Sequence, residues 1–208
     1  MIHKIEFKGE ARVAYELSAM RKMYRVDQYA HLLQVRGKSA TDKKELMDIL
    51  NSLPIRANAI CLVNLVTANR PTEMVRLRVR DFDLKNRSLH VYLKKQKRWH
   101  TKRLTPEVIN AIEVYIREYR LKPDDYFVGR VYKSGRYEST AISEIGYWKA
   151  LQRWTGLTGY NFMKSQVLAM HIAGADLPTI AQQTGHKSLE TLIQHYLTVS
   201  EITVDKHL

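Results

Sequence analysis

The sequence contains a single cysteine, Cys61, among its 208 residues. One thiol excludes an internal disulfide and a metal site built from cysteines. Its neighbours Ile60 and Leu62 are apolar, so we expect a buried thiol in the core. Long apolar runs are also lacking. The best one, from Ala57 to Ala68, is interrupted by two asparagines and is shorter than the roughly 18 residues that a membrane-spanning helix needs.

The N-terminus lacks the apolar core of a secretion signal. Internal repeats and low-complexity linkers are also missing from the chain. A hydrophobic content of 45% with 26% charged residues is typical of a folded, soluble protein. The length is sufficient for one domain with a core of its own. We therefore expect a cytoplasmic protein with one globular domain, or one domain with a short appendage.

Acidic residues are too few to balance the basic ones: 21 Asp and Glu face 34 Lys and Arg, for a net charge of +13. The excess is concentrated in residues 76–103, which contain eleven Lys and Arg and two Asp. Residues 157–208 contain three Lys and four acidic residues. A basic segment beside a near-neutral one predicts a surface that follows phosphates, because each neutralised phosphate releases counterions. The alternative is a soluble protein that is merely basic.

Apolar periodicity, turn residues and capping residues predict a mainly α fold with one small antiparallel β-sheet, of the α+β class. Strands are expected over 1–9, 89–93, 101–104 and 126–128, and helices over 10–34, 41–53, 56–68, 71–77 and 106–119. A further helix through Trp148 and Trp154 is expected to be capped by Ser139 or Ser143. Three short helices are expected after residue 159, separated by turns at 174–176 and 185–188. The strands 89–93 and 101–104 form a hairpin around a lysine-rich turn.

Four segments, taken in order, resemble the catalytic domain of the tyrosine recombinases, the family of phage integrases and Xer-type resolvases. The first is TANRPTEMVRL (67–77), followed by DFDL (81–84), with Ala68-Asn69 where the family has Gly-Leu. The second is the basic hairpin. The third is GADL (174–177) with Gly185-His186, and the fourth is the segment from Thr191 to Tyr196. The resemblance covers about residues 41–200.

The resemblance implies a DNA strand-transferase that cleaves double-stranded DNA through a 3′-phosphotyrosyl intermediate. Its partners would be DNA and further copies of the chain, in a tetramer on DNA, with no metal and no cofactor. Such chemistry needs a nucleophile, cations around the non-bridging oxygens, and a proton donor for the leaving 5′ oxygen. A DNA-associated protein in the cytoplasm of a prokaryote or in a virus-infected cell is the implied setting.

By this resemblance, Tyr196 is the nucleophile, Arg70 is the first phosphate clamp, and His186 donates a hydrogen bond to the phosphate. Glu73 lies three residues after Arg70, where it can orient the guanidinium. Each residue also has a purely structural reading. Tyr196 could pack its ring in the last helix, which Ser188 would cap, and His186 could satisfy the carbonyls at the end of a helix.

The hairpin supplies the proposed general acid. In the family, the catalytic lysine of the hairpin lies at a characteristic spacing from the flanking motifs. Counted forward from residue 81, that spacing points to Lys94 or Lys95, whereas counted back from residue 104 it points to Lys97 or Arg98. On a strand, Lys95 and Lys97 would share one face, so either could reach the minor groove. We prefer Lys95 as the acid, and we expect Lys94, Lys97, Arg98 and Arg76 to bind DNA.

The family's second arginine, in a His-x-x-Arg motif, has no clear counterpart. In one register Tyr160 and Met163 take the two positions, and in the other Asn161 and Lys164 take them. Met163 begins an apolar stripe at helical spacing, which predicts that it is buried. Lys164 is four residues after Tyr160 and shares its face, but a lysine cannot hold a phosphate bidentately. We include Tyr160 and Lys164 in the site and leave the register open.

Three parts of the chain are expected: a strand-helix appendage or linker remnant over 1–40, the catalytic domain over 41–200, and a tail over 201–208. The family usually carries a separate helical core-binding domain ahead of the catalytic one, which 40 residues cannot form. The chain would then be a recombinase with a reduced DNA clamp, or a catalytic fragment. The tail is expected to pack on a subunit and regulate cleavage. The alternative function is a recombinase-like DNA-binding protein that cleaves poorly and acts as a regulator.

Overall fold

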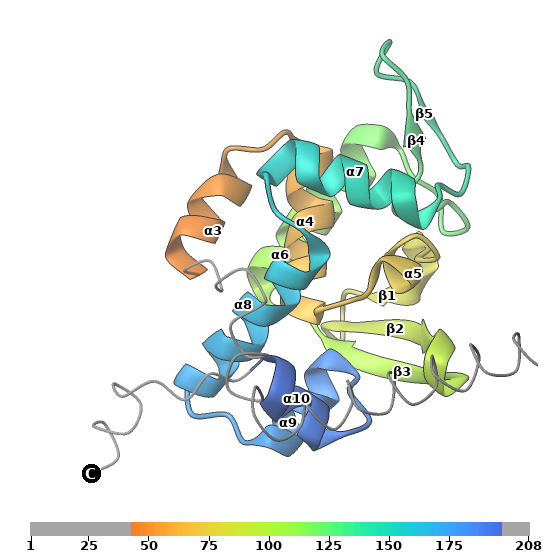
Figure 1. The fold of residues 1–208 in the computed structure, drawn as a ribbon. Helices are drawn as coiled ribbons and strands as arrows, with labels where there is room; N and C mark the ends of the chain where they lie inside the picture. The colour runs from red at the N-terminus through yellow and green to blue at the C-terminus, as the bar shows by residue number, and fades with distance from the viewer. Residues whose placement is uncertain (1–42, 197–208) are drawn as a thin grey trace, which may run out of the picture. The chain divides into compact units, whose positions relative to one another are not determined.

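The computed structural model describes residues 43–196. Over this range the chain is mainly helical with small antiparallel sheets, which confirms the predicted fold class (Figure 1). The strand predicted over 1–9, the helix over 10–34 and the tail over 201–208 lie outside the described residues. None of the described helices is both long and apolar enough to cross a bilayer.

The helices are α3 (Lys43–Asn51), α4 (Ile55–Thr67), α5 (Pro71–Met74), α6 (Pro106–Tyr119), α7 (Glu144–Thr155), α8 (Gly159–Ile172), α9 (Leu177–Thr184) and α10 (Leu189–Tyr196). The strands are β1 (Phe82–Asp83), β2 (Ser88–Leu93), β3 (Arg98–Arg103), β4 (Arg130–Val131) and β5 (Tyr137–Glu138). Two 3₁₀ turns, η1 (Val79–Asp81) and η2 (Lys94–Gln96), interrupt them. All the helices predicted between residues 41 and 196 are present.

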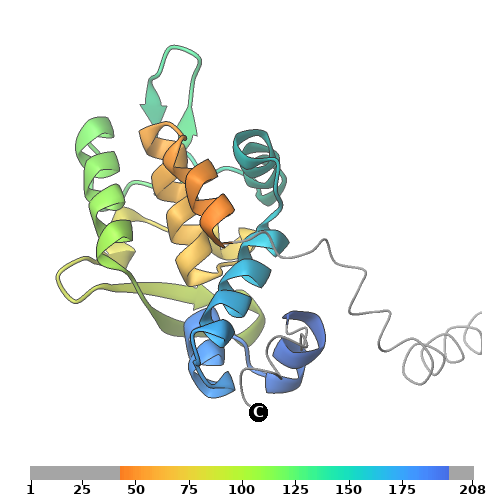
Figure 2. The same ribbon diagram turned by 90° about the vertical axis from the view of Figure 1, so that its left-hand side faces the viewer.

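The apolar helix α4 lies at the centre of the core and packs against α3, α6 and α8 (Figures 1 and 2). Nine of its thirteen residues are buried, because most of its sequence is apolar. Cys61 is fully buried there, as predicted, and burial raises the pKa of its thiol to about 12. The thiol is therefore a packing group and not a nucleophile.

Strands β1, β2 and β3 form one antiparallel sheet in that order. The pairing of β2 with β3 runs to Leu93 and Arg98, so β3 begins three residues earlier than the sequence predicted. The loop between them is closed by η2 and by Lys97, which has a left-handed φ of 52°. The prediction that Lys95 and Lys97 share a strand face is therefore wrong, because neither residue is in a strand.

β4 and β5 form a second, two-stranded antiparallel sheet. The strand predicted over 126–128 is reduced to a single bridge between Tyr126 and Arg78. Phe127 and Val128 are fully buried, and the Phe127 amide donates to the Leu77 carbonyl at 2.8 Å. Their apolar character signals burial in the core and not membership of a strand.

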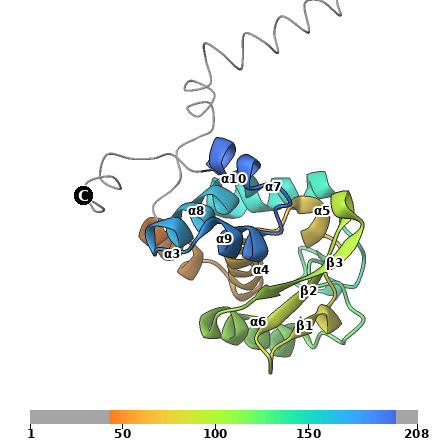
Figure 3. The ribbon, with the colours of Figure 1, turned by 90° about the horizontal axis from the view of Figure 1, so that it is seen from below.

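The C-terminal helices form a small second core, in which Val167, Ile180 and Leu192 are buried together. α8 runs from α4 to α9 and α10 (Figure 3). Asp176 caps α9 by accepting the Thr179 amide at 2.8 Å. These contacts hold the turn between α9 and α10 next to the main domain.

Candidate active site

Arg70 lies in the short link between α4 and α5, where it is the N-terminal cap residue of α5. The Glu73 carboxylate accepts from the Arg70 guanidinium at 3.1 Å and from the Arg70 backbone amide at 3.0 Å. Glu73 is buried, whereas the Arg70 side chain remains 26% exposed. The expected contact between the two residues is therefore present. Part of the Arg70 side chain therefore remains open to solvent.

Side-chain hydrogen bonds join α9 to the sheet and to the end of α4. The Gln183 amide group donates to the carbonyls of Val66 and Arg103, both at 2.9 Å. The Gln96 side chain donates to the Gly185 carbonyl at 2.7 Å, which connects the hairpin to the turn after α9. Three segments that are far apart in sequence, carrying Arg70, the basic hairpin and Gly185-His186, thus lie together on one side of the domain.

His186 follows Gly185, which ends α9 with a left-handed φ of 76°. The His186 side chain is buried, and its Nδ1 lies 2.7 Å from Thr184 Oγ1. The Thr184 hydroxyl proton is donated to the Ile180 carbonyl at 2.7 Å. The Thr184 oxygen therefore accepts the proton on His186 Nδ1, which fixes the orientation of the ring through α9.

Lys102 is a residue that sequence reasoning missed. It is fully buried, and its ammonium donates to the Thr67 carbonyl at 2.8 Å, Asn69 Oδ1 at 2.7 Å and the Thr184 carbonyl at 3.1 Å. Its Nζ also lies 3.8 Å from the Glu73 carboxylate. A signal existed: Lys102 is two residues before Leu104 in the predicted strand, so both face the core.

The start of α8 lies beside the start of α5, since a methyl group added at Gly159 would lie 3.9 Å from the Pro71 ring. Tyr160 is 40% exposed, and partial burial raises the pKa of its phenol, which keeps it neutral at pH 7. Met163 and Lys164 are each only 6% exposed, so the predicted burial of Met163 is confirmed. Burial alone does not separate the two registers.

The need for a partner distinguishes Met163 from Lys164. A buried thioether requires no hydrogen bond, whereas a buried ammonium is costly without an acceptor or a counter-charge. Among the described residues, the Lys164 side chain has no hydrogen-bond or ion-pair partner, and its Nζ is not one of the buried atoms left without one, so the stem is buried and the ammonium reaches solvent. The position of Lys164 is therefore suited to an anion that comes from outside the chain.

The other predicted basic residues are exposed at the surface: Lys94, Lys95, Lys97 and Arg98 at the hairpin, and Arg76 after α5. The Arg98 side chain donates to Gln96 Oε1 at 2.9 Å. Trp99 stands beside them, 64% exposed, with its ring edge against Tyr92 at a centroid distance of 5.6 Å. The hairpin thus presents cations and one exposed aromatic side chain to solvent.

Tyr196 is the last residue of α10, and its side chain lies outside the part that the structure describes. α10 begins three residues after His186, and it packs on α8 and α9. Ser188 caps it by accepting the Thr191 amide at 3.3 Å, as predicted. The helix that carries Tyr196 therefore adjoins the elements that carry His186 and Lys164.

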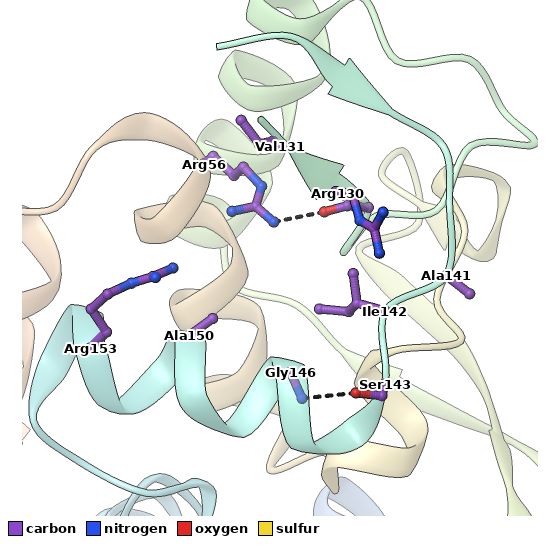
Figure 4. Close-up of a pocket in the computed structure, with 10 residues that line it drawn as sticks. Arg56, Arg130, Val131, Ala141, Ile142, Ser143, Gly146, Ala150 and Arg153 are labelled. Carbon is purple, nitrogen blue, oxygen red and sulfur yellow. Dashed lines mark hydrogen bonds between the residues drawn. The ribbon is translucent and has the colours of Figure 1, made fainter. Parts of the chain in front are cut away.

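A separate cavity of about 530 Å³ lies between α4, β4 and α7 (Figure 4). Arg56, Arg130 and Arg153 line it, and the Arg56 guanidinium donates to the Gly129 carbonyl at 2.7 Å. None of its lining residues belongs to the predicted site. Within the described range, no group of three His, Cys, Asp or Glu is placed to hold a metal ion.

A family model described as "Phage integrase family" matches residues 39–202. The chain therefore belongs to the phage integrase family, which confirms the resemblance seen in the sequence. A search of curated protein sequences found no match.

Solved structures of recombinases share the fold at low identity. XerA recombinase is 17% identical, with a TM-score of 0.69, over 83% of this chain and 63% of XerA. XerH recombinase, bound to its difH substrate in a pre-cleavage complex, is 16% identical with a TM-score of 0.62, over 82% of this chain and 53% of XerH. The Tn1549 transposon integrase, in complex with transposon right-end DNA, is 14% identical with a TM-score of 0.63, over 88% and 69%. The chain thus spans less than two thirds of the XerA and XerH chains.

Proposed function

We propose that this chain is a site-specific DNA recombinase that cuts and rejoins DNA through Tyr196. One observation carries the proposal: the Gln183 and Gln96 hydrogen bonds join the end of α4, which leads into Arg70, to the basic hairpin and the His186 turn. This is the combination of cations and hydrogen-bond donors that a phosphodiester in a pentavalent transition state requires.

In the proposed reaction, the Tyr196 phenol oxygen attacks the scissile phosphorus, and its proton passes to water. The phosphorus–O5′ bond breaks, its electron pair stays on O5′, and the Lys95 ammonium protonates that oxygen. A 3′-phosphotyrosyl bond and a free 5′-hydroxyl result. Attack by a 5′-hydroxyl of a second strand reverses these steps and restores the tyrosine, so the phosphoester bond energy is conserved.

The remaining site residues stabilise charge on the phosphate. Arg70 and Lys164 neutralise the non-bridging oxygens, and the neutral Tyr160 phenol donates a hydrogen bond to them. His186, whose Nδ1 proton is donated to Thr184, contributes its Nε2 proton as an imidazolium. Lys94, Lys97, Arg98 and Arg76 contact the DNA backbone on either side. Among the solved relatives, XerH is described as bound to a DNA substrate and Tn1549 integrase as bound to DNA, which supports double-stranded DNA as the partner. Exchange of strands between two sites calls for a tetramer on DNA.

A nicked suicide substrate tests the function, because loss of the short 5′ fragment traps the covalent adduct. We expect the wild-type chain to form an adduct that survives denaturing electrophoresis, and Tyr196→Phe to bind the same DNA without forming it. Tyr115→Phe is a matched control, because its hydroxyl lies in the core and bonds the Phe127 carbonyl. Salt-sensitive binding without an adduct would instead identify a DNA-binding regulator.

A further inference from the structure

Lys102 lies at an inward-facing position of β3. Residues of β3 are alternately exposed and buried, and Lys102 shares the buried face with His100. A fully buried lysine is rare unless it is paired, because removing its charge from water is unfavourable. The burial of a lysine at this point in the fold therefore needs a specific explanation.

The ammonium of Lys102 has three N–H donors and three acceptors at 2.7–3.1 Å. Two acceptors, the Thr67 carbonyl at the end of α4 and Asn69 Oδ1 in the link after it, belong to the segment that leads directly into Arg70. The third is the carbonyl of Thr184, whose hydroxyl holds the His186 ring. One buried cation thus joins the segment before Arg70 to the segment before His186.

The same ammonium faces the back of the Arg70–Glu73 pair. One Glu73 carboxylate oxygen accepts the Arg70 amide at 3.0 Å and lies 3.8 Å from Lys102 Nζ. Glu73 is therefore placed between two cations, of which Arg70 is partly exposed and Lys102 is fully buried. Gly185 completes the contact, since a methyl group added there would lie 3.5 Å from Lys102 Cε.

We propose that Lys102 is a positioning residue that sets the spacing between Arg70 and His186 without touching DNA. This role rests on the proposed function, because the spacing matters to catalysis only if both side chains bind one phosphate. Misplacement of a catalytic group by about 1 Å lowers a rate by roughly 100-fold. A purely structural lysine, by contrast, can often be replaced by an apolar side chain without loss.

The charge of Lys102 provides a readout that a structural role would not give. Burial lowers the pKa of the ammonium to about 8, with the Glu73 carboxylate acting against the shift and Arg70 adding to it. His100 on its own strand and His186 on the adjoining turn are the other titratable groups nearby. Above pH 8 the neutral amine has two N–H donors for three acceptors, so one side of the connection is released.

The test compares wild type with Lys102→Met on the suicide substrate between pH 6.5 and 9.5. We expect the variant to form the adduct roughly 100-fold more slowly at pH 7, with unchanged affinity for DNA. The ratio of wild-type to variant rate should fall as the pH rises through about 8. Ile112→Ala, a core truncation on α6, controls for general loss of stability. The ratio of the wild-type rate to the Ile112→Ala rate should not change with pH. A Met variant with the wild-type rate and pH profile would overturn the proposal.

Amide hydrogen exchange separates this proposal from the proposed function. The amides of Glu73 and Met74 donate to the Arg70 carbonyl, and those of Gly185 and His186 donate to the Ala181 carbonyl. Lys102→Met should speed exchange at both sites, whether or not the wild-type chain cleaves DNA. If Lys102→Met does not fold, Asn69→Ala takes its place. This variant removes one acceptor and keeps the charge of Lys102, so it should speed exchange at the same amides more weakly. Unchanged exchange at both sites would refute the connection even in an active recombinase.

Discussion

The carboxylate of Glu73 holds Arg70 at two points, the guanidinium at 3.1 Å and the backbone amide at 3.0 Å. The second bond closes the first turn of α5, and the first directs the side chain. A buried carboxylate between two cations is therefore the element on which the orientation of the proposed phosphate clamp depends.

Replacing Glu73 by Gln should slow adduct formation by roughly 10- to 100-fold, since hydrogen bonds to charged groups contribute about 1.5–3 kcal/mol. Removal of the negative charge should also lower the pKa of Lys102 further, because Glu73 raises it. The alkaline fall in cleavage rate should therefore begin below pH 8. Rates measured across pH with Glu73→Gln check both effects. An alkaline limb that stays in place would show that Lys102 does not sense Glu73.

Lys164→Ala should lower the cleavage rate by about 10²–10³, the effect of removing one transition-state donor. Lys164→Arg should retain or raise the rate, because a guanidinium can bind the phosphate through two N–H groups. Met163→Arg should destabilise the fold by about 3–5 kcal/mol, because it places an unpaired charge in the core. The suicide-substrate assay and thermal melts measure these effects. Faster cleavage by Met163→Arg, with no effect of Lys164→Ala, would assign the second-arginine position to Met163 instead.

Gly185→Ala and Gly174→Ala form a matched pair, since both glycines have a left-handed φ, of 76° and 87°. At Gly174 the new methyl group meets open space, so only the backbone strain of about 1–2 kcal/mol applies. At Gly185 it would also lie 3.2 Å from Leu93, which adds crowding next to His186. Denaturant unfolding should show the larger loss for Gly185→Ala, and only that variant should lose cleavage beyond its loss of folded protein. Equal effects would mean that the packing at Gly185 is not critical.

Lys95→Ala and Lys97→Ala should have different effects on cleavage and binding. Without its general acid, Lys95→Ala should cleave about 10²–10⁴-fold more slowly. A substrate with sulfur in place of the 5′ oxygen should restore its rate, because a thiolate leaves without a proton. Lys97→Ala should instead weaken binding and reduce the salt-dependence slope by about 1, with no such rescue. Rescue of Lys97→Ala and not of Lys95→Ala would exchange the two roles.

The free energy of unfolding should respond to pH in the direction opposite to cleavage. The pKa of Lys102 is lowered from 10.5 to about 8 on folding, so the unfolded chain binds more protons between these two values. Stability from this group therefore rises as the pH increases from about 8 to 10.5, because the cost of burying a charge is relieved. The stability difference between wild type and Lys102→Met, from urea titrations, should grow in favour of wild type across that interval. A constant difference would mean that Lys102 titrates normally.

Local signals in the sequence predicted most of the helices. α6 begins at Pro106 because Thr105 caps it and proline is suited to the first turn, and its bounds match the prediction. The contact between Arg70 and Glu73 was also predictable, since it joins residues three apart. β1 was not, because its two residues are a strand only through pairing with β2, which follows in the chain.

The partners of Lys102 show where prediction from local patterns ends. They lie 33, 35 and 82 residues away in sequence, so no local pattern identifies them. The sequence placed that whole segment on a DNA-facing surface, whereas the structure removes Lys102 from it into the core. Alternation with Leu104 indicates that Lys102 faces inward, but only the folded arrangement of α4, β3 and α9 supplies the acceptors that hold it there.

The most direct test of the proposed function is to identify the residue that carries the DNA. After reaction with a nicked substrate, the adduct is digested with protease and nuclease, and the nucleotide-linked peptide is sequenced by mass spectrometry. We expect a 3′-phosphate linked to the phenol oxygen of Tyr196. A linkage to any other residue, or complete reaction with no linked peptide, would contradict it.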